Sequence, residues 1–167
     1  SHVRDESNKV FESWDEVLRI GREAGLPVGI THIKLGAAST WHLAAARMPA
    51  YFERAKREGV QLIPDVYPYT YWHSTIRVIV PDRDFFNADK VARALEENGG
   101  AAALRFASYQ PDPSLAGKTL AEMAAHWGIG PVEAYMRTIR ETAAEVDTGV
   151  PMEDIIGTSM SEDDVRW

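Results

Sequence analysis

The 167-residue sequence contains no cysteine, which excludes disulfide bridges, thiolate nucleophiles and cysteine-ligated zinc sites within it. Any metal ion must therefore be held by histidine, aspartate or glutamate side chains. Basic residues are also few, with 18 lysines and arginines against 25 aspartates and glutamates, and the formal net charge is -7. An acidic chain without a basic patch is not expected to bind nucleic acid.

Long apolar runs are absent as well. No stretch approaches the roughly 20 residues that span a bilayer, and the first residues lack the basic and then apolar order of a secretory signal. We therefore expect a soluble, cytoplasmic protein that does not enter a membrane. The composition, with 45% hydrophobic and 26% charged residues, is typical of a chain that buries a core.

The first 70 residues alternate between helical and strand patterns. Apolar residues at helical spacing predict a helix from Val10 to Ala24, and Gly25 ends it. The β-branched run 28–33 predicts a strand buried on both faces. A second helix is expected over 40–58 and another strand over about 61–67. This order is typical of βα units in a parallel sheet.

The alternation ends after Tyr69. Residues 71–154 are interpreted as an α-rich insertion that contains one strand within 101–108, because most of their patterns are helical. The predicted helices of this insertion span 87–98, 119–127 and 131–146. A short strand and the start of a helix are expected in the last segment, 155–167.

Two histidines stand one βα repeat apart. His2 and His32 are separated by 30 positions that contain one predicted helix and one predicted strand. If both follow neighbouring parallel strands, which lie about 4.8 Å apart, their imidazoles can share one metal ion. The alternative, that each histidine is structural, stays open on spacing alone. His42, His73 and His126 lack this strand context and are interpreted as structural.

Further polar side chains lie near the same strand ends. Lys34 follows His32 by two residues and points to the same side of an extended chain, where an ammonium group can bind a carboxylate or polarise a carbonyl. Tyr67 ends the next predicted strand and can hydrogen-bond a substrate. The charged residues 4–6 can form an ion network that secures His2. Ordinary surface roles for these residues are equally compatible with the sequence.

Five short motifs follow one another in a characteristic order. They are SHVRDE at 1–6, THIK at 31–34, DVYPY at 65–69, GKTL at 117–120 and SMSEDDV at 159–165. Each is weak alone, but together they resemble the N-acyl-D-amino-acid deacylase (D-aminoacylase) family of the amidohydrolase superfamily. The resemblance covers essentially the whole chain. It implies a metal-dependent enzyme that hydrolyses N-acyl-D-amino acids to a carboxylate and a free D-amino acid.

This resemblance implies an α/β fold, namely a partial (β/α)8 TIM barrel of the metal-dependent hydrolase type with an α-rich insertion. Residues 1–70 then supply barrel strands five to seven, 71–154 the insertion, and 155–167 the approach to the final strand. A whole barrel takes about 250 residues. We therefore expect an incomplete segment, inactive alone, whose partner is the remainder of the same barrel or a second chain.

The resemblance also implies roles for individual residues. His2 and His32 correspond to metal ligands at the ends of strands five and six, and zinc is the expected metal, with one or two divalent ions in the complete enzyme. Lys34, Tyr67 and Ser74 correspond to residues that line the substrate pocket. The bulky run 69–73 departs from the smaller residues expected there, which leaves the identity of the substrate open.

No catalytic residue is assigned within the chain, because the resemblance places the general-base aspartate beyond Trp167. We predict a hydrolase of linear amide bonds, acting on carbon–nitrogen bonds other than peptide bonds, with a small N-acyl amino acid as substrate. Two alternatives stay open. A cyclic-amide hydrolase of the dihydroorotase kind shares the barrel and both histidines, whereas a non-catalytic βα binding or assembly module would bind no metal at them.

Overall fold

The computed structural model describes residues 1–167, apart from the side chains of residues 145 and 146, and divides the chain into two units. The first unit comprises Ser1–Thr70 and Ser159–Trp167, and the second comprises Tyr71–Thr158. The elements of the first unit are α1 (Val10–Ala24), β1 (Val28–Ile30), the 3-10 helix η1 (Ala38–Thr40), α2 (Ala44–Arg57), β2 (Leu62–Pro64) and α7 (Glu162–Val165).

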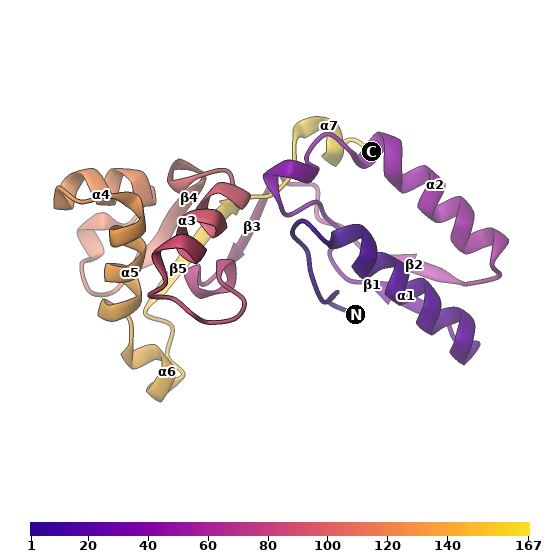
Figure 1. Ribbon diagram of the computed structural model, residues 1–167, viewed down its shortest axis with the longest axis horizontal. Helices are drawn as coiled ribbons and strands as arrows, with labels where there is room; N and C mark the ends of the chain where they lie inside the picture. The colour runs from indigo at the N-terminus through magenta and orange to yellow at the C-terminus, as the bar shows by residue number, and fades with distance from the viewer. The chain divides into compact units, whose positions relative to one another are not determined.

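Helices α1 and α2 pack on the β1–β2 pair of the first unit (Figure 1). Their apolar faces meet in a core that includes the fully buried Trp14, because the apolar residues of α1 recur at helical spacing. The Tyr51 hydroxyl donates a hydrogen bond of 2.6 Å to the Trp14 carbonyl and so links the two helices. At Gly21 of α1, an added Cβ would lie 2.7 Å from the Val60 side chain, so the close packing of this helix requires glycine.

The two predicted strands of this unit pair in parallel, with Val28 opposite Leu62. On the other edge of β1, the Ser1 amino group donates to the Gly29 carbonyl at 2.8 Å, and the Thr31 amide donates to the Ser1 carbonyl at 3.0 Å. These two bonds have the pattern of a parallel ladder. Strand β1 therefore lies between the beginning of the chain and β2, as expected for successive βα units.

Both strands of the first unit are shorter than the sequence suggests. The predicted strand 28–33 ends at Ile30, since His32 has a left-handed backbone with φ 42°, and the predicted strand 61–67 is reduced to Leu62–Pro64. Burial on both faces was also expected. Within the first strand only Ile30 is fully buried, whereas Val28 and Gly29 are partly exposed. Ile63 of β2 and Val66 just after it are 56% and 62% exposed.

The second unit contains a three-stranded antiparallel sheet with the order β3-β5-β4. Its strands are β3 (Tyr71–Ser74), β4 (Leu104–Tyr109) and β5 (Glu153–Thr158). Its helices are α3 (Ala88–Glu97), α4 (Leu120–Trp127), α5 (Pro131–Glu141) and α6 (Ala144–Thr148), with 3-10 helices η2 (Ile76–Ile79), η3 (Ala101–Ala103) and η4 (Pro113–Leu115).

Several predicted features of the second unit are present. Thr119 and Glu122 form the capping box that opens α4, and Asn87 caps α3. The predicted helix 131–146 is instead two helices, α5 and α6. Strand β3 was not foreseen. The short strand expected at the start of 155–167 is present as the end of β5, the central strand of this sheet, and the barrel role assigned to that segment stays a prediction.

The last residues of the chain return to the first unit, where α7 packs beside α2 (Figure 1). The buried Asp164 carboxylate accepts hydrogen bonds from the amides of His42 at 2.7 Å and Ala44 at 3.0 Å, just before and at the start of α2. It also accepts from the Ser161 amide and hydroxyl, which caps α7. Among the described residues, no helix combines the length and the apolar character needed to span a bilayer.

Candidate metal centre

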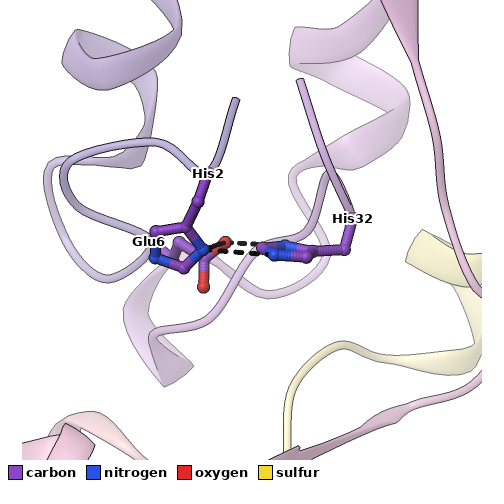
Figure 2. Close-up of side chains that lie close together, drawn as sticks. All are labelled: His2, Glu6 and His32. Carbon is purple, nitrogen blue, oxygen red and sulfur yellow. Dashed lines mark hydrogen bonds and ion pairs between the residues drawn. The ribbon is translucent and has the colours of Figure 1, made fainter. Parts of the chain in front are cut away.

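The ladder between Ser1 and β1 brings His2 and His32 together. His2 follows Ser1, and His32 follows Thr31, whose amide is bonded to Ser1. The Nδ1 atom of His2 lies 3.1 Å from the Nε2 atom of His32, and the ring centroids are 4.9 Å apart. Figure 2 shows the two side chains pointing towards each other, with the rings in an edge arrangement at an interplanar angle of 66°. The close approach predicted from the spacing of one βα repeat is therefore present.

A carboxylate completes the cluster. The Oε1 atom of Glu6 lies 2.9 Å from His32 Nδ1 and 3.7 Å from His2 Nδ1. Figure 2 shows the Glu6 carboxylate beside the two histidines. One nitrogen or oxygen atom from each of the three residues falls within 4.8 Å of the others. Gly36 holds the Glu6 backbone by donating a hydrogen bond of 2.8 Å to its carbonyl. An added Cβ at residue 36 would lie 2.3 Å from that oxygen, so this support requires glycine.

Of the three charged residues 4–6 expected to secure His2, only Glu6 contacts the histidines. Arg4 pairs with Glu16 instead. Asp5 accepts hydrogen bonds from the amides of Ser7 and Lys9 and so shapes the turn before α1. The sequence therefore identified the segment but not which of its carboxylates faces the site.

Lys34 reaches the same cluster. Its Nζ atom lies 2.5 Å from Glu6 Oε2 and 2.9 Å from His32 Nδ1, and the residue is only 7% exposed. Burial lowers the pKa of Lys34, and the ion pair with Glu6 opposes that effect. Glu6 thus offers one oxygen to the lysine and the other to the histidine ring.

Tyr67 belongs to the same unit. Burial raises the pKa of its phenol, and the negative charge of Glu6 raises it further, so the hydroxyl stays protonated and can donate a hydrogen bond. Ser74, the remaining predicted substrate residue, lies in the second unit on β3, opposite Ile155. Of the histidines interpreted as structural, His42 lies in a left-handed turn before α2, His73 on β3 and His126 in α4.

The cluster fits a divalent metal ion. Two imidazole nitrogens bound at 2.0–2.1 Å in a tetrahedral shell are about 3.3 Å apart, close to the observed separation of 3.1 Å. His32 Nδ1 lies 2.9 Å from both Glu6 Oε1 and Lys34 Nζ, so these two side chains hold the far side of the ring and the other ring nitrogen, Nε2, is directed towards His2. A carboxylate on the far nitrogen of a ligating imidazole is the usual support of a metal-bound histidine.

No protein-family model matches the chain, but individual proteins do. It is 32% identical over 137 residues to the N-acyl-D-glutamate deacylase of Alcaligenes xylosoxydans xylosoxydans, a match that covers 82% of this chain and 24% of the relative. It is 29% identical over 128 residues to the D-aminoacylase of the same organism, with 77% and 22% covered. The chain thus spans about a quarter of the length of these curated relatives.

Solved structures agree. The crystal structure of N-acyl-D-glutamate deacylase from Bordetella bronchiseptica, complexed with zinc and a phosphonate inhibitor, matches 99% of this chain and 29% of its own with a TM-score of 0.70 and 26% identity. A D-aminoacylase structure, described as defining a novel subset of amidohydrolases, has a TM-score of 0.67 over 99% of this chain and 28% of its own, and at 23% identity this likeness concerns the fold. The chain therefore belongs to the N-acyl-D-amino-acid deacylase (D-aminoacylase) family.

Proposed function

We propose that this chain is part of a metal-dependent N-acyl-D-amino-acid deacylase in which His2 and His32 bind a divalent ion, zinc in the first instance. The observation that carries the proposal is the 3.1 Å approach of the two imidazoles beside the Glu6 carboxylate. We further infer that the β1–β2 pair is part of a (β/α)8 barrel, with Tyr71–Thr158 inserted into it. The mixed α/β architecture and the relatives support this assignment.

When bound, a divalent ion supplies a water of lowered pKa and polarises the carbonyl of the amide that is hydrolysed. The residues of this chain hold and orient the participants. His2 and His32 present their facing nitrogens to one point, and Glu6 fixes the His32 ring from its other side. Relatives act on N-acyl-D-glutamate or are named D-aminoacylases, which supports an N-acyl-D-amino acid as the substrate class.

Substrate orientation is assigned to Lys34 and Tyr67. The Lys34 ammonium lies beside the cluster and is placed to attract the free carboxylate of an N-acyl-amino acid. We assign to the Tyr67 hydroxyl, which burial keeps protonated by raising its pKa, a hydrogen bond donated to the same substrate. The Ser74 role implied by the family stays a proposal of the same kind. A lysine that fixes the carboxylate and a metal that fixes the amide together constrain the stereochemistry at the carbon between them.

The complete polypeptide that contains this segment tests the proposal directly. We expect it to hydrolyse N-acyl-D-amino acids and to leave the L enantiomers and cyclic imides largely intact. Activity should fall when a chelator removes the metal and return when zinc is added. Preferred hydrolysis of a cyclic imide would instead assign the protein to the cyclic-amide hydrolases, and turnover that survives complete removal of metal would contradict the metal mechanism.

A Tyr67→Phe substitution separates substrate binding from metal binding. Because one neutral hydrogen bond contributes about 0.5–1.5 kcal/mol, we expect KM for an N-acyl-D-amino acid to rise about threefold to tenfold. The zinc content, measured by atomic absorption, should not change. Tyr69→Phe is the matched control, since Tyr69 is 65% exposed and lies two residues away. If the Tyr67→Phe variant loses zinc as strongly as it loses affinity for the substrate, Tyr67 has a structural role.

A further inference from the structure

His32 has a backbone conformation that a histidine rarely adopts. Its φ of 42° is in the left-handed region, where the Cβ of an L-residue crowds the neighbouring carbonyl. The residue follows the last ladder bond of β1, so this conformation turns the chain and sets the direction in which the imidazole leaves the strand. Something must hold the residue there, because an unsupported left-handed histidine relaxes to a commoner conformation.

The support comes from Asp65, which lies directly after β2. Its Oδ1 atom accepts a hydrogen bond of 2.6 Å from the His32 amide. The main chain of Asp65 is fixed at the same time, because its amide donates to Ile30 at 3.1 Å and its carbonyl accepts from Ile33 at 2.8 Å. Asp65 therefore binds the residues on both sides of the turn with its backbone, and the turn residue itself with its carboxylate.

A second histidine of the same unit repeats the arrangement. His42 also has a left-handed backbone, with φ 66°, and its amide donates a hydrogen bond of 2.7 Å to the Asp164 carboxylate. In both cases an aspartate distant in sequence accepts the amide of a left-handed histidine. Neither His42 nor Asp164 belongs to the metal cluster, so this carboxylate supports a backbone conformation and not a metal ligand. This supports the same interpretation at His32.

We propose that Asp65 is the positioning residue of the metal ligand His32, acting through the backbone and without touching the ion. The proposal rests on the proposed function, because it assumes that His32 binds metal. With the Asp65 bond in place, the His32 Nε2 atom is held towards His2 before the metal arrives. Without it, part of the metal-binding free energy must be used to impose the left-handed turn, and the affinity falls.

The test compares Asp65→Ala and Asp65→Asn in the complete polypeptide, with zinc affinity measured by competition against a chromophoric chelator. Loss of a supporting partner typically weakens metal binding by about 10-fold to 100-fold. We expect that loss for Asp65→Ala, whereas Asp65→Asn keeps an acceptor oxygen and should stay within about fivefold of the wild type. The visible spectrum of the cobalt-substituted protein should change in Asp65→Ala and be largely restored in Asp65→Asn.

Asp112→Ala is the matched control. Asp112 also accepts a backbone amide through its carboxylate, from Ser114 at 3.0 Å, but it lies in the second unit. Its substitution should leave zinc affinity and the cobalt spectrum unchanged. Should Asp65→Ala fail to fold, Asp65→Ser replaces it, because the serine oxygen is one bond too short to reproduce the contact.

The outcomes distinguish this inference from the proposed function. If His32→Ala does not weaken zinc binding, the metal assignment of His32 itself fails. If His32→Ala loses zinc but Asp65→Ala binds it as tightly as the wild type, the metal site stands and the positioning role of Asp65 is wrong. If both Asp65 variants lose turnover with unchanged zinc affinity and an unchanged cobalt spectrum, Asp65 acts in the chemistry, and the positioning role is again overturned.

Discussion

Replacing His32 with alanine in the complete polypeptide is expected to weaken zinc binding by on the order of 100-fold to 1,000-fold. A four-ligand zinc site binds with about 10–16 kcal/mol, so each ligand accounts for about 2.5–4 kcal/mol. The loss should be at least as large as for His2→Ala. The His32 ring contacts Glu6 and Lys34 as well as His2. Its removal therefore also breaks the contacts that hold the cluster together.

Zinc content after dialysis and chelator competition measure this effect, and turnover of an N-acyl-D-amino acid should fall in parallel. His73→Ala is the control, because His73 has a 63% exposed side chain on β3 of the second unit and pairs there with Asp154. Undiminished zinc affinity in both His2→Ala and His32→Ala would favour the alternative of a non-catalytic βα module. Loss in only one of them would show that the two imidazoles do not share an ion.

Replacing Asp164 with alanine is expected to lower the free energy of unfolding by on the order of 3 kcal/mol. Asp164 is 4% exposed, and its carboxylate accepts hydrogen bonds from the amides of His42, Ala44 and Ser161 and from the Ser161 hydroxyl. A buried donor left without its acceptor costs about 1–3 kcal/mol. Water offsets part of that cost at His42, where the residue is exposed. The amide of Ala44 is in a buried residue, so most of the loss in free energy of unfolding should come from that amide.

Thermal unfolding measures the loss of stability as a lower melting temperature. Hydrogen exchange locates it, and residues 42–44 and 159–167 should exchange faster in the variant. Asp163→Ala is a sharp control: Asp163 is the neighbouring carboxylate, its side chain is 78% exposed, and it pairs with the nearby Arg166. Equal stability of the Asp164 and Asp163 variants would mean that the last residues are not fixed to the start of α2 by this carboxylate.

The same carboxylate predicts a pH dependence. Burial raises the pKa of Asp164, but the hydrogen bonds donated by Ala44, His42 and Ser161 outweigh burial, and the pKa in the folded protein lies below the ordinary value of 3.8. Because this pKa is lowered on folding, the ionised carboxylate contributes its full stabilisation above pH 3.8. That stabilisation is lost as the pH falls through the folded-state pKa. Acid should therefore release residues 159–167, and Asp164→Ala should abolish that part of the acid sensitivity.

Local sequence signals were sufficient for several helices and for the approach of the two histidines. The apolar spacing and Gly25 fixed α1 to the residue, and the capping box of Thr119 and Glu122 marked α4, because caps and amphipathic faces depend on residues within one turn. One βα repeat between His2 and His32 was enough to predict their approach, since successive parallel strands are neighbours.

The tertiary structure alone decided the partners of these elements. Strand β3 is four residues long and pairs with β5, a strand more than 75 residues later, so nothing nearby in sequence marks it. Glu6, and not Asp5, lies at the metal cluster, and its carbonyl accepts a hydrogen bond from the distant Gly36; the support of His32 by Asp65 spans 33 positions. Chain neighbours determine backbone preference and periodicity, whereas the group that satisfies a buried or strained backbone amide is determined only by packing across the fold.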